Sequence, residues 1–176
     1  MTVHDETMKL LLAGLDRPVI QNAVRSMYVE YQVAVLLGEE WQLVGTDWGG
    51  WDFQSRSGHR LELKQAAAKQ SWAQTMPSKG VFDIASRTGH YEGATWIGGA
   101  GRFADVYVFA WHGGWDDSTD QRDETQWQYF VVPTLDLPIQ RTISLSRLRR
   151  LIGPTTAASL SAAVAEVARS ISIDAR

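Results

Sequence analysis

The chain has 176 residues, of which 44% are hydrophobic and 21% are charged, proportions typical of one folded domain and not of long disorder. Seventeen Lys and Arg against 20 Asp and Glu give a net charge of −3, so no overall basic field attracts nucleic acid or acidic lipid. The chain has no cysteine, which excludes disulfides, thiolate nucleophiles and Cys-ligated zinc and favours a reducing compartment. We therefore expect a cytoplasmic location.

The N-terminal segment, residues 1–15, is expected to be a flexible arm. Its apolar run Leu10-Leu11-Leu12 is shorter than the core of an export signal, and acidic residues precede it. No stretch of the chain approaches the roughly 18 apolar residues that a membrane span requires, so no membrane partner is expected.

A helix is predicted between Asp16-Arg17-Pro18, a typical helix start, and Gly38, a typical helix end. At 100° per residue, one arc of this helix is apolar and is expected to be buried, with Glu30 at its edge. The residues of that arc are Ile20, Ala23, Val24, Met27, Tyr31, Ala34 and Val35.

Three short strands are predicted next, over 41–44, 51–54 and 60–66, with glycine-containing turns between them. A helix over 66–74 is expected to follow, and the glycine-rich segment 77–101 receives no assignment. Strands over 103–111 and 127–132 flank an acidic loop, and helices near 144–152 and 155–171 form a C-terminal extension over 140–176. The pattern predicts a single domain over 1–176, with mixed α/β structure around one sheet.

Charged side chains alternate along the third predicted strand, so Arg60, Glu62 and Lys64 share one face. A hairpin with a three-residue loop ending in Gly58 would place Asp52 directly opposite Glu62. Their Cβ atoms would then be about 4.5–5.5 Å apart, a separation at which two carboxylates repel unless a cation lies between them.

A divalent cation is the natural candidate for that position. Oxygen ligands from Asp52 and Glu62, with the Leu63 carbonyl and water, suit Mg²⁺ or Mn²⁺ better than zinc. Lys64 would lie beside the bound water or a phosphate, where it could stabilise negative charge or take a proton. The same spacing also fits an exposed ladder of cross-strand ion pairs among Asp52, Arg60, Glu62 and Lys64 that has no catalytic role.

Two motifs stand close together in the chain, Trp51-Asp52-Phe53 and Leu61-Glu62-Leu63-Lys64. They are followed by Ala66-Ala67 and Gln70-Ser71-Trp72 and preceded by Glu30 in the predicted helix. This arrangement resembles the PD-(D/E)XK nuclease superfamily, also called restriction endonuclease-like. The closest likeness is to small bacterial members. The order of elements is similar over about residues 20–133, and the motifs are specific only over 50–72. Trp51 stands where the superfamily's name places a proline.

The resemblance implies a restriction endonuclease-like core, in which helices flank a mixed central sheet in the order αβββαβ. It further implies a Mg²⁺-dependent phosphodiesterase site at Asp52, Glu62 and Lys64, with Mn²⁺ as a substitute metal and Glu30 as an assisting acid. The expected activity is endonuclease-like hydrolysis of nucleic acid, with DNA as the expected partner. The alternative is an inactive nuclease-fold protein that serves as a binding or regulatory module.

Two further sets of residues are candidates for nucleic-acid contacts. Gln70 could position a phosphate or water and Trp72 could stack on a base, although a surface amide and a core tryptophan fit equally well. Arg147, Arg149 and Arg150 lie in a stretch without acids that could contact backbone phosphates, or they form an ordinary charged helix face. The sequence leaves the oligomeric state open, a homodimer included.

Overall fold

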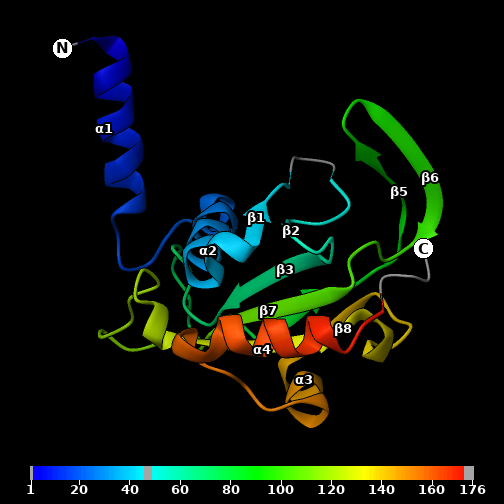
Figure 1. Cartoon of the computed structure of the whole chain (residues 1–176). Coiled ribbons are helices and arrows are strands. Elements are labelled where there is room, and N and C mark those ends of the chain that lie inside the picture. Colours follow the sequence, from blue (N-terminus) through cyan, green and yellow to red (C-terminus); the bar gives the residue numbers. More distant parts are fainter. Residues whose placement is uncertain (1, 46–48, 173–176) are drawn as a thin grey trace.

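A computed structural model describes residues 2–45 and 49–172 and has a five-stranded mixed sheet at its centre (Figure 1). The strand order is β1-β2-β3-β7-β8, in which only the β3–β7 pair is parallel. The predicted mixed α/β architecture with flanking helices is confirmed. The strands of the sheet are β1 (Trp41–Leu43), β2 (Phe53–Ser55), β3 (Arg60–Ala67), β7 (Val106–His112) and β8 (Trp127–Pro133).

The β2–β3 hairpin has the register that the sequence predicts. Phe53 pairs with Leu61 and Gln54 with Arg60, and Gly58 adopts the left-handed conformation with φ +92°. That conformation closes the short loop and is strained for residues with a side chain. The odd-numbered residues of both strands therefore face one side of the sheet, and Glu62 and Lys64 face the other.

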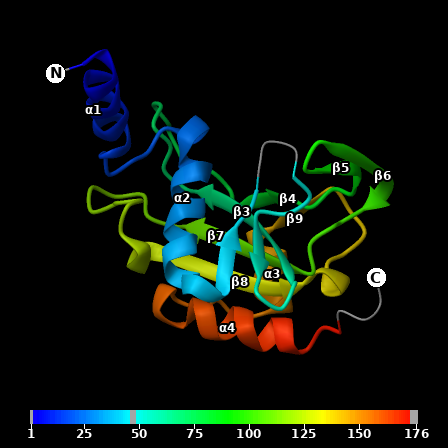
Figure 2. The same ribbon diagram turned by 45° about the horizontal axis from the view of Figure 1, so that its top comes forward.

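Helices α2 (Asn22–Leu37) and α4 (Ala157–Arg169) cover one face of the sheet (Figure 2). The other face packs against the ribbon formed by β4 (Val81–Asp83) and β9 (Thr142–Ser144) and against α3 (Leu145–Leu151). Each face has its own cluster of buried apolar side chains. The helices predicted near 144–152 and 155–171 are thus confirmed. The described residues also include three short 3-10 helices, at Gly38–Glu40, Glu124–Gln126 and Thr134–Asp136.

The predicted start and buried arc of the first long helix are wrong. The Gln121 side chain accepts a hydrogen bond from the Ile20 amide and holds the chain before α2 in a non-helical conformation. The helix therefore begins at Asn22 and not at the predicted start near Pro18. The buried residues of α2 are Arg25, Val29, Val33 and Leu37. The opposite side carries the exposed apolar side chains Met27, Tyr31 and Val35.

The helix predicted over 66–74 does not form. β3 continues through Ala67 because Ala66 and Ala67 pair with Trp111 and His112 of β7. The connection from β3 to β7 contains β4 and a hairpin made of β5 (Arg87–Glu92) and β6 (Thr95–Gly101), and no helix. The predicted order αβββαβ is therefore wrong at its second helix, because strands β4, β5 and β6 occupy that part of the chain.

Residues 3–15 of the expected N-terminal arm form a helix, α1 (Val3–Leu15), which stands apart from the sheet (Figure 1). Thr2 and Asp5 cap its first turn by exchanging hydrogen bonds, and none of its side chains is buried. Within the described parts of the chain, no helix has the length and apolar character needed to cross a bilayer.

Candidate active site

Asp52 is fixed from both sides immediately before β2. Its amide donates to the Leu61 carbonyl at 2.9 Å, and its own carbonyl accepts from the amides of Val44 and Gly45. Its carboxylate Oδ2 accepts from the Leu63 amide at 2.7 Å, so the side chain lies against the edge of β3. The chain thus brings Asp52 beside the strand that carries Glu62 and Lys64.

Glu62 is almost completely buried, with 3% of its side chain exposed, and two cations contact one of its oxygens. Lys64 Nζ lies 2.5 Å and Arg87 Nη2 2.7 Å from Glu62 Oε1. The second nitrogen of the Arg87 fork donates to the Gly49 carbonyl at 3.1 Å. A buried carboxylate held in this way does not belong to an exposed ladder of ion pairs, so that alternative is wrong for Glu62.

Arg60 contacts Trp51 and Glu92. Its guanidinium lies 3.8 Å from the centre of the Trp51 ring, in a cation–π contact, and 3.7 Å from Glu92. The positive charge next to Glu62 therefore comes from Lys64 and Arg87.

Burial and the negative charge of Glu62 raise the pKa of two neighbouring carboxyl groups, those of Asp52 and Glu30. Burial, and then the neighbouring charge of Glu62, raises the pKa of Asp52 from 3.8 to about 7. Burial and Glu62 also raise the pKa of Glu30, which projects from α2. Among the described residues, Asp52 forms no ion pair with Lys, Arg or His. The place beside Asp52 is thus short of positive charge.

These ligand types fit a hard divalent cation. Two carboxylates contribute oxygens, and the Leu63 carbonyl faces the same strand edge as the Leu63 amide that Asp52 accepts from. No group of three or more His, Asp or Glu side chains is arranged to hold a metal in the described ranges 2–45 and 49–172. Asp52, Glu62 and Leu63 would therefore need water or substrate oxygens to complete the coordination shell, as is usual for Mg²⁺.

Gln70 and Trp72 lie at the end of β3, in different surroundings from each other. The Gln70 side chain accepts from Arg25 at 3.0 Å and donates to the Ala67 carbonyl at 2.7 Å, so both ends of its amide have partners. Trp72 is 55% exposed and lines a pocket of about 550 Å³ beside the start of α2. The alternative that Trp72 is a core residue is therefore wrong, because more than half of Trp72 is exposed to solvent.

The three arginines of α3 are exposed and lie away from the carboxylates. Arg149 donates to Gln128 of β8 at 3.0 Å, two strands across the sheet from β3. Arg147 and Arg150 are exposed on the same helix. The structure does not bring these arginines together with Asp52 and Glu62.

Arg87 and Arg25 are residues that the sequence analysis missed. Arg87 begins β5, in a segment that showed no periodicity, and a lone arginine there gives no signal of a contact 25 positions away. Arg25 is buried and donates to Asn22, Gln65 and Gln70, which ties α2 to the end of β3. The sequence does give one signal for Arg25: it is a charged residue on a side of the helix that is otherwise apolar, with Val29, Val33 and Leu37.

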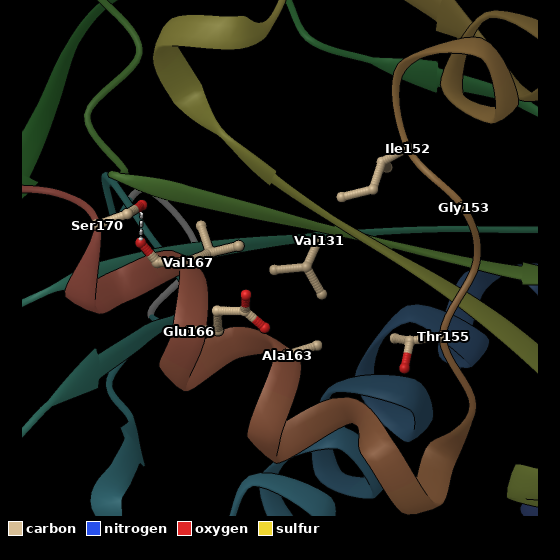
Figure 3. A pocket seen from close by; sticks show the side chains of 8 residues that line it. All are labelled: Val131, Ile152, Gly153, Thr155, Ala163, Glu166, Val167 and Ser170. Atoms are coloured by element: carbon tan, nitrogen blue, oxygen red, sulfur yellow. Dashed lines mark hydrogen bonds between the residues drawn. The ribbon is translucent and has the colours of Figure 1, made fainter.

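A separate pocket of about 270 Å³ lies between α4 and β8, on the helix-covered face of the sheet (Figure 3). Its walls are largely apolar, and Glu166 is the one ionisable residue among the eight that line it. None of the predicted site residues lines it, so it does not belong to the carboxylate site.

Comparison of the sequence with protein-family models and with curated proteins gives no match.

Proposed function

We propose that this protein is a divalent-metal-dependent nuclease of the restriction endonuclease-like class, which hydrolyses phosphodiester bonds in nucleic acid, with DNA as its substrate. The observation that carries the proposal is the juxtaposition of Asp52 and Glu62 from adjacent antiparallel segments, with Lys64 bound to Glu62. The motif likeness around Asp52 and Glu62 supports the same reading.

In this proposal Asp52, Glu62 and the Leu63 carbonyl hold Mg²⁺ or Mn²⁺. The metal, when bound, would polarise a phosphate oxygen and lower the pKa of a coordinated water. The negative charge of the two carboxylates is then balanced, which removes the repulsion that raises the pKa of Asp52.

The chain's own residues orient and neutralise the reacting groups. Glu62 holds the Lys64 ammonium in place at 2.5 Å, so Lys64 presents a fixed positive charge near the carboxylates. That charge would stabilise the additional negative charge on the phosphate as water attacks. Glu30, whose pKa is raised by burial and by the charge of Glu62, would assist with a proton or a water molecule.

The direct test is incubation of the purified protein with plasmid DNA, linear duplex DNA, single-stranded DNA and RNA in the presence of Mn²⁺. We expect cleavage of at least the DNA substrates, and EDTA should stop it. If no substrate is cleaved while the protein still binds DNA, the chain is a binding module and not an enzyme.

Lys64→Ala should separate catalysis from metal binding. The variant keeps Asp52, Glu62 and the Arg87 contact and loses a cation from Glu62, so its affinity for Mn²⁺ should be at least that of wild type. Loss of the fixed ammonium should lower the cleavage rate by about 100-fold or more. Cleavage at the wild-type rate would show that Lys64 has no part in the reaction. Lys9→Ala, which changes an exposed lysine of α1, is the matched control.

A further inference from the structure

Arg87 reaches the carboxylate site from a separate part of the fold. Lys64 lies two residues from Glu62 on the same strand face, so its contact follows from strand alternation. Arg87 instead begins the β5–β6 hairpin, which stands in the connection between β3 and β7 and extends beyond the sheet (Figure 1). Its contact with Glu62 is therefore a feature of the tertiary structure.

The Arg87 side chain is much more accessible than its partner. It is 40% exposed, whereas Glu62 is 3% exposed, and its two terminal nitrogens contact Glu62 and the Gly49 carbonyl. Lys64 already supplies one positive charge to Glu62. One cation is enough to neutralise the Glu62 carboxylate, and Arg87 places a second one on the same oxygen.

A divalent cation and Arg87 would compete for Glu62. The Arg87 guanidinium contacts Glu62 directly, so a metal that shares this carboxylate with Asp52 would be repelled by it at close range. Lys64 is tethered to the same strand, while Arg87 has a long, partly exposed side chain that can shift. A guanidinium displaced to the edge of this site would face a phosphate, whose oxygens match its fork of donors.

We propose that Arg87 occupies Glu62 as a substitute cation in the metal-free protein and transfers to the substrate phosphate when the metal is bound. This inference rests on the proposed nuclease function, because it names a further residue that contacts the substrate of that reaction. It assigns two opposite effects to one side chain: Arg87 weakens metal binding and accelerates cleavage.

The test measures Mn²⁺ binding without nucleic acid, by calorimetric titration, and DNA cleavage, for Arg87→Met and wild type. We expect the Kd for Mn²⁺ to fall by roughly tenfold in Arg87→Met, because a competing cation is removed, and the cleavage rate to fall by about 100-fold. Arg56→Met is the matched control, because Arg56 is an exposed arginine that pairs with Glu39, and it should change neither quantity.

The outcomes distinguish this proposal from the proposed function. If wild type binds no Mn²⁺ and cleaves nothing, the nuclease proposal itself fails. If wild type binds Mn²⁺ and cleaves DNA but Arg87→Met binds the metal no more tightly, or cleaves at the wild-type rate, only the role of Arg87 is overturned.

Arg87→Lys keeps the test decisive even if Arg87→Met does not fold. This variant retains the charge and loses the fork, so the Kd for Mn²⁺ should remain within about threefold of wild type while cleavage falls by about tenfold. Cleavage at the full rate would contradict the contact between the Arg87 fork and the phosphate, and a large loss of metal affinity would contradict its role as a competitor of the metal.

Discussion

Asp52 and Glu62 lie side by side but have opposite electrostatic surroundings. Glu62 has Lys64 and Arg87 on one oxygen, whereas among the described residues the Leu63 amide is the hydrogen-bond donor to the Asp52 carboxylate. The sequence predicts that the two carboxylates meet, because strand alternation and the loop length determine it. It does not predict how the cations are distributed, because Arg87 comes from a distant hairpin.

Asp52→Asn should make the metal-free protein less sensitive to pH. Folding raises the pKa of Asp52 to about 7 from 3.8, so between these values the folded state binds more protons than the unfolded state. The contribution of Asp52 to the free energy of unfolding therefore falls as pH rises from about 4 to about 7. Asparagine resembles the protonated carboxyl group but does not titrate, so the Asp52→Asn protein does not lose this stability as pH rises. In EDTA, the Tm of Asp52→Asn should exceed that of wild type at pH 8 and approach it at pH 4.5.

Glu62→Gln is the matched comparison for that measurement. It leaves Lys64 and Arg87 without their carboxylate partner, so its Tm should fall below wild type at pH 8. An Asp52→Asn protein that melts below wild type at pH 8 would contradict the raised pKa of Asp52.

At the scale of elements, α2 shows where a sequence pattern is ambiguous. The helix has apolar side chains on two sides: Val29, Val33 and Leu37 pack on the sheet, and Met27, Tyr31 and Val35 lie on the outer side. Periodicity detects both sides and cannot tell which one meets the core. The same limit applies to residues 66–74, where pairing with β7 overrides the helix preference of alanine.

A pair of valine substitutions on α2 distinguishes its two sides. Val33→Ala removes two methyl groups from a fully buried site, so the free energy of unfolding should fall by about 2 kcal/mol. Val35 is 82% exposed, so Val35→Ala should change the free energy of unfolding by less than about 0.5 kcal/mol. Urea unfolding of both variants measures the difference. Equal losses would mean that the outer side of α2 is also covered in solution.

At the scale of the whole molecule, local rules predict the parts of the fold that local geometry determines. The β2–β3 register, the buried strands β7 and β8, and helices α3 and α4 all follow from turn residues and apolar patterns. The β4–β9 ribbon is different, because its strands are about 60 residues apart in the sequence and each is too short to show a pattern. The contact between Arg87 and Glu62, which are 25 positions apart, is likewise outside the reach of a local pattern.

In the proposed site, Asp52 and Glu62 together would bind a divalent cation. Calorimetric titration of Mn²⁺ at pH 8, without nucleic acid, tests it most directly, because Asp52 is then largely ionised. Wild type should bind Mn²⁺, and Asp52→Asn should weaken that binding by about 100-fold or more, since a direct ligand contributes at least as much as its supporting residues. If wild type gives no binding heat, or if Asp52→Asn binds Mn²⁺ as tightly as wild type, Asp52 and Glu62 do not form a metal site.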